Sequence, residues 1–594
     1  MYDFVLVLSL QSIAANVSVL KRAGINWENI ILNLVIDGRE DIPKDVYDYL
    51  KYSLRIVDED MMLMTRKGKQ VICHIFERTV RIPRHTATRE YHSPIQLTLT
   101  LKERRGGIMN SQVWFFGINK QIRPKYCMIL NTGTMPRSFS LRNMYQYMEL
   151  DAQLGVISGE ICPYDAKLYS ITQASQSFRN KLSHVLEKPA DTMSGLINPF
   201  SGSYTMYRLI AIQGPPLDTY FRIEDESLVN FTPFSANLYL SVERLMNFET
   251  VVQRKQNWLT RYVNDAPADQ EMSTSLLDSI VSERRHMTGE LLSGVYYMKN
   301  ISRLWTESYH TLTRKLFLSI QFLVSTASLG FLWFAPAVMY IVFFYIFASS
   351  ISGLGLGTDI ISFGFHAIYI GTTALQILFS LGSRPEDVER IFLTSCIIYG
   401  MFMYVVFVLF SLAASQGAFS PMLLYGLAIG GGTIVVAALI HGSLRIMILS
   451  FFQYMFMFPT FVNLFMVYSF CNLHDISWRL KNSEGSLDVL AAQARSEMQD
   501  NAKDVRAYTD RKRPSLVLKE VEIQLRQLQK ANWFENDNPE APPNILEEQE
   551  IEPDEVPDYT NDGPRFSKIA DPRQILERAY QAAERKKIDE RVEK

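Results

Sequence analysis

An acidic residue follows directly after a strand-like apolar run near the start of the chain. Residues 30–36 read IILNLVI, and Asp37, Gly38 and Arg39 come next. An almost unbroken apolar run of this length is typical of a buried parallel strand. Ligands of open α/β sheets bind beyond the carboxyl ends of such strands. The pattern therefore predicts that Asp37 is presented to a ligand at a sheet edge.

Two later segments also place polar groups after apolar runs. Residues 131–136 (NTGTMP) follow YCMIL, and residues 202–208 (GSYTMYR) follow a loop that contains Pro199. Asn, Gly and Pro after a strand are equally typical of an ordinary turn. For each segment alone an ordinary turn is the simpler interpretation. Residue type and spacing do not decide between a turn and a segment that presents polar groups for chemistry.

The elements that would position these groups alternate along the first part of the chain. Further strands are predicted at residues 70–76 (QVICHIF), 95–101 (IQLTLTL) and 126–130 (YCMIL), and helical periodicity is present at residues 140–150 and 175–186. Strands that alternate with helices favour an α/β domain with a mainly parallel sheet.

The second part of the chain is dominated by long apolar segments. Six of them, each 17 to 25 residues long, lie at residues 316–334, 335–351, 360–381, 391–414, 422–440 and 446–470. About 20 helical residues cross a hydrocarbon core of about 30 Å, and a helix satisfies its own backbone groups in lipid. Any one segment could be a buried core helix, but six in succession predict an α-helical transmembrane bundle.

The charges that flank these segments leave the topology open. Arg314 and Lys315 favour a cytosolic amino-terminal domain under the positive-inside rule, but Arg384 and Arg390 would then lie outside. The first residues, MYDFVLVLSL, have the apolar core of a secretory signal, but Asp3 stands where a positive flank is required. We therefore do not interpret the start of the chain as a signal peptide.

The composition argues against several classes of site. The formal net charge is -2 over 594 residues, and no basic stripe with interleaved aromatic residues is present, so we expect no nucleic-acid binding. The 5 cysteines are scattered, without the paired spacing of a zinc site or a disulfide framework. This pattern fits a reducing, cytosolic setting for the soluble parts.

Several motifs together resemble a fungal-type chitin synthase, a processive family 2 glycosyltransferase. The most specific is FCNLHDISW at residues 470–478, which matches the family's marker FCNLHDxSW. Residues 176–208 resemble QxFxxKxSxxLxKP followed by PGAFSAYR, and TRKLFL recurs intact at residues 313–318. Shorter matches lie at residues 108–116 (KINSHRWFF in the family), 129–136 (LLDVGTRP), 158–161 (CGEI) and 379–385 (LSLGNRP).

The resemblance, which covers roughly residues 1–480, implies a domain organisation. We expect an α/β glycosyltransferase domain of the GT-A type at residues 1–290, an amphipathic interfacial region at 291–315, the transmembrane bundle at 316–470 and a polar tail at 471–594. In this interpretation the tail is partly disordered and carries short helices at residues 515–530 and 571–594.

The resemblance also implies a reaction and its setting. The donor would be UDP-N-acetylglucosamine, used with a divalent Mg²⁺ or Mn²⁺ ion, and the product would be a β-1,4 chitin chain that leaves through the membrane bundle. Such a transfer needs a carboxylate for the metal, cations for the leaving UDP and a base for the acceptor hydroxyl. We expect a multi-pass protein of the plasma membrane and of secretory vesicles, with its catalytic-like domain and tail in the cytosol, in a homo- or hetero-oligomer with chitin synthase.

Residues that fall on family positions outline a nucleotide-sugar pocket. Those expected to bind substrate are Asp37, Gly38, Arg39, Glu160, Gly202, Tyr207, Arg208 and Trp478. Those at catalytic positions are Glu243, Arg244, Arg284 and Arg285, and Asn131 stands at the metal position.

The departures from the family are concentrated at functional positions. Asn131 replaces the metal-binding Asp, and an amide brings no negative charge to a hard cation. Glu243 replaces the base of the EDR motif and is one methylene longer, and a shift of about 1 Å in a reacting group can cost about a hundredfold in rate. Ser282 and His286 replace the Gln and the Trp of QRRRW, and we interpret His286 as a solvated or packed side chain.

Replacements also affect the donor side of the pocket. Gly107 and Ile108 stand for two lysines of the nucleotide-contacting stretch NQKKINS, and Met135 stands for the Arg of LLDVGTRP. We therefore expect a chitin synthase-family membrane protein that is catalytically weak or inactive and acts as partner or regulator of an active synthase. The alternative is an active chitin synthase that uses Glu243 as base and a metal held mainly by the substrate. A metal cofactor is expected only if the protein is active, and otherwise none.

Overall fold

The computed structural model describes residues 2–66, 69–83, 91–105, 107–164, 168–197, 204–229, 237–272, 275–353, 358–417 and 419–474. Two compact units are present, one containing Met1–Cys127 and Tyr207–Tyr239, the other Met128–Met206 and Leu240–Asp475. The helices predicted at residues 515–530 and 571–594 lie outside the described residues, and so do Gly202 and Trp478.

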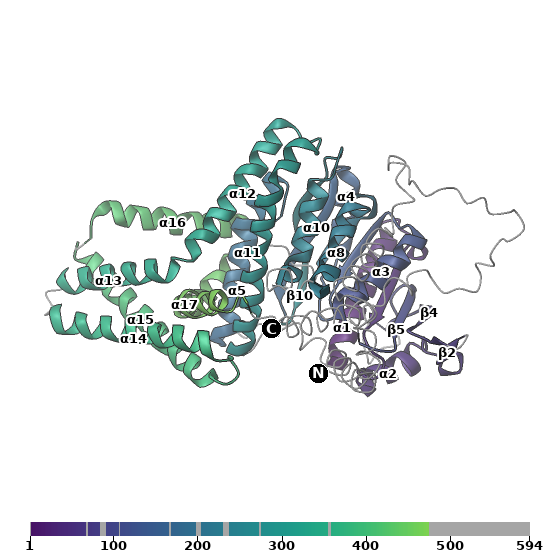
Figure 1. Ribbon diagram of the computed structural model, residues 1–594, viewed down its shortest axis with the longest axis horizontal. Helices are drawn as coiled ribbons and strands as arrows, with labels where there is room; N and C mark the ends of the chain where they lie inside the picture. The colour runs from purple at the N-terminus through teal and green to yellow at the C-terminus, as the bar shows by residue number, and fades with distance from the viewer. Residues whose placement is uncertain are drawn as a thin grey trace, which may run out of the picture. The chain divides into compact units, whose positions relative to one another are not determined.

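The first unit contains a three-stranded mixed sheet of order β1-β5-β4 (Figure 1). β1 (Ile31–Ile36) pairs in parallel with the central strand β5 (Ile95–Lys102), and β4 (Cys73–Val80) pairs antiparallel with the other side of β5. The strands predicted at residues 30–36 and 95–101 are confirmed, each shifted by one residue at one end. The strand predicted at residues 70–76 begins three residues later, at Cys73.

A long amphipathic helix packs against this sheet. α1 (Tyr2–Arg22) buries Leu10, Ala14 and Val17 in the same core as Leu97 of β5. The apolar start of the chain is therefore a packed helix of this unit. The other elements are β2 (Thr65–Arg66), β3 (Lys69–Gln70), α2 (Lys44–Asp48), α3 (Gly107–Ile122), α7 (Leu209–Ile212) and α8 (Pro215–Val229), with single turns at Trp27–Asn29, Tyr49–Ser53 and Glu59–Met61.

The larger sheet has five strands in the order β6-β9-β8-β10-β7. β8 (Leu154–Pro163) and β10 (Leu259–Gln270) are its longest strands and run parallel, whereas β7 (Met135–Pro136) is antiparallel to β10 at one edge. β6 (Tyr126–Leu130) has the bounds predicted from its apolar run, and β9 is Tyr204–Arg208. Both sheets are therefore mixed, because antiparallel strands flank the parallel pairs.

Helices of the second unit carry most of the sequence motifs. α4 (Ser140–Leu150) has the predicted bounds. α5 (Ile171–Leu182) continues through a wider turn at Ser183–Glu187 into α6 (Lys188–Ser194), so the helix predicted at residues 175–186 belongs to a longer helical segment.

Two further helices hold the motifs of residues 242–244 and 282–286. They are α10 (Val242–Val251) and α11 (Leu276–Thr306), and a short turn at Tyr239–Ser241 precedes α10. The ring of Phe248 on α10 stacks on Tyr297 of α11 with centroids 4.7 Å apart, which fixes one helix against the other. α11 runs without a break across residue 290, and the domain boundary expected there stays a prediction.

Apolar helices make up the rest of the second unit. They are α12 (Leu312–Leu332), α13 (Ala335–Gly353), α14 (Thr358–Gly382), α15 (Glu389–Ser415), α16 (Pro421–Ile440) and α17 (Leu444–Thr460), which continues through Phe461–Met466 into α18 (Val467–Cys471) (Figure 1). Within the described ranges seven helices are long and apolar enough to cross a membrane, and the seventh is Val5–Arg22 of α1. The six predicted segments all fall on this set. The fold class is therefore as predicted, an α/β domain with an α-helical transmembrane bundle.

Candidate functional site

Asp37 lies at the end of β1, where the sequence predicts an acid, and both of its carboxylate oxygens are engaged within the protein. Oδ1 lies 2.6 Å from Nζ of Lys102, and Oδ2 accepts a hydrogen bond from the backbone N–H of Gly107 at 2.7 Å. Lys102 is 2 % exposed and also donates to Oδ1 of Asn110 at 2.8 Å. Asp37 is thus the counterion of a buried lysine and holds the first residue of α3.

Gly107 makes this arrangement possible. Its φ is +85°, a conformation that residues with a side chain rarely adopt, and its N–H points at Asp37. Gly107 is also one of the two positions at which the family motif has lysine. The replacement therefore removes a cation and permits the positive φ at which the backbone N–H meets the expected uridine-binding acid.

The neighbours of Asp37 are held as tightly. Gly38 has a φ of +97°, which residues with a side chain rarely adopt, and a Cβ there would lie 3.3 Å from the backbone N of Arg105, so glycine is strongly favoured. Arg39 forms an ion pair with Glu103, with Nε 3.3 Å from Oε1. These contacts give the loop after β1 a defined shape.

The other donor-side residues of this unit are packed into it. Tyr207 and Arg208, at the end of β9, are buried. The guanidinium of Arg208 lies over the ring of Tyr126, 5.2 Å from its centroid, and donates to its hydroxyl at 3.3 Å. Arg208 thus has an aromatic partner within the protein.

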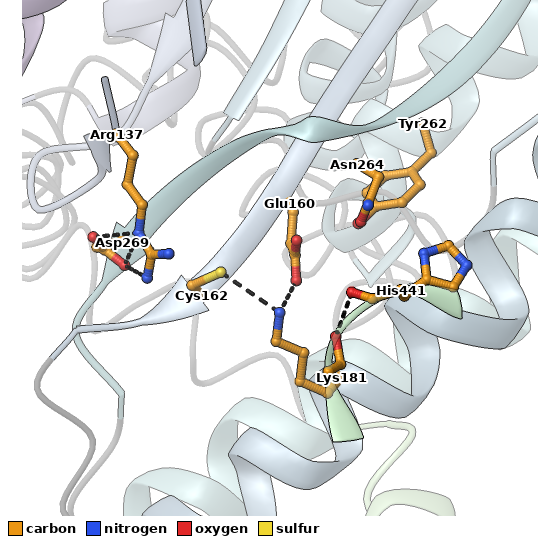
Figure 2. A network of polar contacts seen from close by, with 9 residues as sticks. Arg137, Glu160, Cys162, Lys181, Tyr262, Asn264, Asp269 and His441 are labelled. Atoms are coloured by element: carbon orange, nitrogen blue, oxygen red, sulfur yellow. Dashed lines mark hydrogen bonds and ion pairs between the residues drawn. The ribbon is translucent and has the colours of Figure 1, made fainter. Parts of the chain in front are cut away.

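Glu160 occupies the middle of a buried polar cluster on β8 (Figure 2). Its carboxylate forms a hydrogen-bonded ion pair with Lys181 of α5, and Nζ of Lys181 also lies 3.9 Å from Sγ of Cys162. Burial raises the pKa of Cys162 to about 11. Burial also lowers the pKa of nearby Lys188 to about 8, although Glu160 opposes this shift. The carboxylate of Glu160 therefore balances the positive charges of Lys181 and Lys188 inside the protein.

The turn interpretation of residues 131–136 is the one that the structure shows. The N–H of Thr134 donates to the backbone carbonyl of Asn131 at 3.0 Å, and Gly133 has a φ of +98°. The side chain of Asn131 is exposed. Asp269, which stands opposite Met135 in the β7–β10 pair, forms a bidentate ion pair with Arg137 at 2.6 and 2.9 Å (Figure 2).

These residues do not fit a metal ion held by protein ligands. Asn131 offers an uncharged amide, and the nearby Asp269 is committed to Arg137. Among the residues that the structure describes, no three His, Cys, Asp or Glu side chains come together as ligands of a metal ion.

Glu243 and Arg244 lie in the first turn of α10. Glu243 is partly exposed, whereas Arg244 is 6 % exposed. Nη2 of Arg244 lies 3.2 Å from Nε2 of His286 on α11. The backbone carbonyl of Arg244 accepts a hydrogen bond from the hydroxyl of Tyr297 at 3.1 Å. The structure thus joins the base motif to the residue that replaces the family's Trp.

His286 is consequently an acceptor for Arg244. Burial, and next the Arg244 guanidinium, lowers the pKa of His286 to about 4. A neutral imidazole can accept a hydrogen bond from the guanidinium at Nε2. The packed-histidine interpretation agrees with this contact.

The cations of the α11 motif are also affected by their surroundings. Arg284 is 5 % exposed, and burial together with Arg284 lowers the pKa of Arg285. Glu283, at a position where the family has Arg, forms two hydrogen bonds with the guanidinium of Arg179 at 2.5 and 2.6 Å. Burial raises the pKa of Glu283, but Arg179 more than offsets this and leaves the pKa below its ordinary value.

Sequence reasoning missed the partners of these residues. For Lys102 a signal was present, because Ile36 and Leu101 are neighbours in the β1–β5 register and Asp37 and Lys102 each follow by one residue. Lys181 stands at the invariant Lys of the QxFxxKxSxxLxKP pattern. Arg179 stands at a variable position of that pattern and carried no signal.

Comparisons with known proteins agree with these observations. Curated relatives include Chitin synthase 1 of Phytophthora sojae, 28% identical over 500 residues that cover 81% of this chain and 54% of that protein. Chitin synthase 2 of Cryptococcus neoformans var. grubii is 30% identical over 517 residues, which cover 80% of this chain and 54% of that protein. The chain spans about half the length of the curated relatives it matches. Residues 3–301, half of the chain, match the family profile described as a chitin synthase-like glycosyltransferase domain, and the chain belongs to the chitin synthase family.

Proposed function

We propose that this chain is a weak or inactive member of the chitin synthase family that acts as partner or regulator of an active synthase. The observation that carries the proposal is the rearrangement of the α11 motif. Where the family has an indole, His286 is hydrogen-bonded to Arg244, and where it has an arginine, Glu283 is paired with Arg179.

Both changes act against polymer synthesis. An acceptor sugar is held by a flat apolar ring, whereas His286 is a polar ring already bonded to a cation. With a pKa of about 4, His286 is neutral at cytosolic pH, like the indole it replaces, so the change lies in the lost apolar stacking surface. Glu283 reverses the charge at its position, and preorganised cations are a main source of rate enhancement in phosphoryl-linked chemistry.

The donor side supports the same conclusion. Asp37 already pairs with Lys102 and Gly107, so a nucleotide must compete with an internal counterion. Asn131 adds no charge for a metal. A base one methylene longer at Glu243 can cost about a hundredfold in rate if it misplaces the carboxylate by about 1 Å, but Glu243 alone does not rule out activity. General acid–base help alone is worth about 10²- to 10⁴-fold.

The proposal includes the ligands and setting of the family. A retained pocket would bind UDP-N-acetylglucosamine weakly and would contact a chitin chain made by the partner. Mg²⁺ or Mn²⁺, held mainly by the diphosphate, belongs to the alternative of an active synthase. The protein would reside in the plasma membrane and secretory vesicles as a homo- or hetero-oligomer with chitin synthase, with the catalytic-like domain in the cytosol.

An assay of the purified chain tests the catalytic part. Proteoliposomes that contain only this protein receive radiolabelled UDP-N-acetylglucosamine with Mg²⁺, with Mn²⁺ or with neither, beside a preparation of an active synthase. We expect no labelled polymer above background from this chain. Abundant chitinase-sensitive polymer would reject the proposal.

The alternative, an active synthase, is favoured by one observation. Glu243 is partly exposed in the first turn of α10, so a carboxylate is present at the base position. If polymer forms, Glu243→Gln should abolish it under this alternative, and Asp265→Asn, a surface acid on β10, should leave it unchanged.

A second assay tests the partner role. The chain is co-expressed with an active synthase, and the two are purified through a tag on this chain. We expect the synthase to co-purify and its specific activity to change. Equal synthase activity and no co-purification would reject the partner role even where the first assay finds no polymer.

A further inference from the structure

A polar hollow lies in the second unit at the point where the loop after α10 meets the end of α11. It has a volume of about 450 Å³ and is lined by Arg254, Lys255, Thr306, Glu307 and Tyr309. None of these residues belongs to the motifs described above.

The walls of the hollow are held together by backbone contacts. The N–H of Lys255 donates to the carbonyl of Glu307, and the N–H of Tyr309 donates to the carbonyl of Gln256, both at 2.9 Å. Nε2 of the buried His310 lies 2.9 Å from the carbonyl of Val251. These contacts fix the loop, in which Lys255 adopts a positive φ of +57°.

The hollow lies just before, along the chain, the first apolar helix that follows the α/β domain. α12 begins at Leu312, three residues after Tyr309, and its side chains Leu312 and Phe317 are exposed on a helix that can cross a membrane. Three extended residues span at most about 10 Å, and the headgroup layer on each side of a bilayer is about 5–7 Å thick. Tyr309 therefore lies within about 10 Å, along the chain, of a helix that is apolar enough to enter a bilayer.

Two exposed aromatic residues support a position close to the bilayer surface. Tyr309 and Trp305 are both exposed, and Trp and Tyr are enriched at membrane–water interfaces. The indole N–H of Trp305 donates to Oγ of Ser319 on α12 at 3.1 Å, and Nζ of Lys315 donates to the carbonyl of Trp305 at 3.0 Å. The end of α11 is thus attached to the first turns of α12.

The charges of the hollow suit a phosphate. Arg254 and Lys255 are exposed cations on one wall, and Thr306 and Tyr309 add hydroxyl groups. Glu307, the acid of the lining, lies 3.4 Å from Nε of Arg303, whose guanidinium also donates to Glu249 at 2.8 and 2.9 Å. The lining therefore carries two cations, Arg254 and Lys255, against one acid whose charge is partly offset. We propose that this hollow binds the headgroup of an anionic phospholipid, with the phosphate against Arg254 and Lys255. The proposal is independent of whether the chain is an active transferase.

Lipid titration of the full chain tests the proposal. The protein is placed in nanodiscs of phosphatidylcholine with increasing phosphatidylserine, and retained lipid is counted by native mass spectrometry alongside the melting temperature. We expect phosphatidylserine to be retained and to raise the melting temperature, with the double variant Arg254→Gln and Lys255→Gln about tenfold to thirtyfold weaker in apparent affinity. Lys299→Gln, an exposed cation of α11 outside the hollow, is the matched control and should behave as the wild type.

Two results would overturn the proposal. One is equal phosphatidylserine retention by the wild type and the double variant, with both proteins monodisperse. The other is an equal stabilisation by inorganic phosphate or glycerophosphoserine in phosphatidylcholine discs, which would show a site for free anions.

Discussion

Nζ of Lys102 lies 2.6 Å from the carboxylate of Asp37, and Lys102 is almost fully buried. The family resemblance implies that Asp37 meets uridine, and in this structure Asp37 is also the counterion of a buried lysine. A single acid thus connects the end of β1, the end of β5 and the start of α3.

The first prediction concerns Asp37. Asp37→Asn leaves a buried ammonium without its counterion, and we expect the free energy of unfolding to fall by about 2–3 kcal/mol, because breaking a buried pair costs more than the pair contributes. The melting temperature of the detergent-purified protein measures the loss. Adding Lys102→Met removes both charges and should restore part of the stability, and a double variant no more stable than Asp37→Asn would contradict the ion-pair explanation.

The second prediction concerns Arg179 and Glu283. Glu283→Gln and Arg179→Gln should each lower the melting temperature, and their coupling in a double-mutant cycle should be about 1–3 kcal/mol, because two charged hydrogen bonds join them. Arg179→Gln should cost more, since its guanidinium also lies over the ring of Phe461 at 5.3 Å. Additive effects of the two single variants would show that the pair is not coupled.

Much of the fold follows from apolar patterning. Strands β1 and β6 are nearly continuous apolar runs, and β5 alternates Leu with Gln and Thr. The apolar helices are recognised by their length and composition. The prediction for β4 ended at Phe76, because the polar residues Glu77, Arg78 and Thr79 follow it in this edge strand. β10 was not predicted, since its sequence LTRYVNDAPADQ is polar and contains Pro267.

The site could be predicted less well, because its chemistry depends on distant partners. Residue identity placed Asp37 at a strand end and His286 on a helix. Whether those side chains can contact a ligand depends on their protein partners. Lys102 pairs with Asp37 from 65 positions away, and Arg244 contacts His286 from 42 positions away. Only the parallel register of β1 and β5 offered a signal for such a contact.

The third prediction concerns helix packing in the transmembrane bundle. A Cβ at Gly400 of α15 would lie 2.2 Å from the ring of Phe456 on α17, so Gly400→Ala should separate the two helices and cost about 1–3 kcal/mol. Gly426→Ala on α16 is the control, because a Cβ there meets nothing within 4 Å. Size-exclusion chromatography of heated samples should show aggregates at a lower temperature for Gly400→Ala than for the wild type or Gly426→Ala. The same aggregation temperature for the two variants would refute the contact.

The fourth prediction concerns acid sensitivity and His286. An unfolded histidine has a pKa of about 6.5, and the folded pKa of His286 is about 4. Between these values the unfolded chain binds more protons, so stability is full above pH 6.5 and falls as the pH drops towards 4. Burial also lowers the pKa of His184 and of His310, which adds to the same loss.

His286→Gln isolates the contribution of one histidine. Because the His286 side chain is 39% exposed, we expect it to account for only about 1 kcal/mol of the loss. Melting temperatures measured from pH 8 to pH 4.5 should therefore decline less steeply in His286→Gln than in the wild type. At pH 7.5 and above neither protein changes its histidine charge, so that range is the internal control. Parallel pH profiles would mean that the Arg244 contact does not hold His286 neutral, and would remove the main support for the proposed rearrangement of the α11 motif.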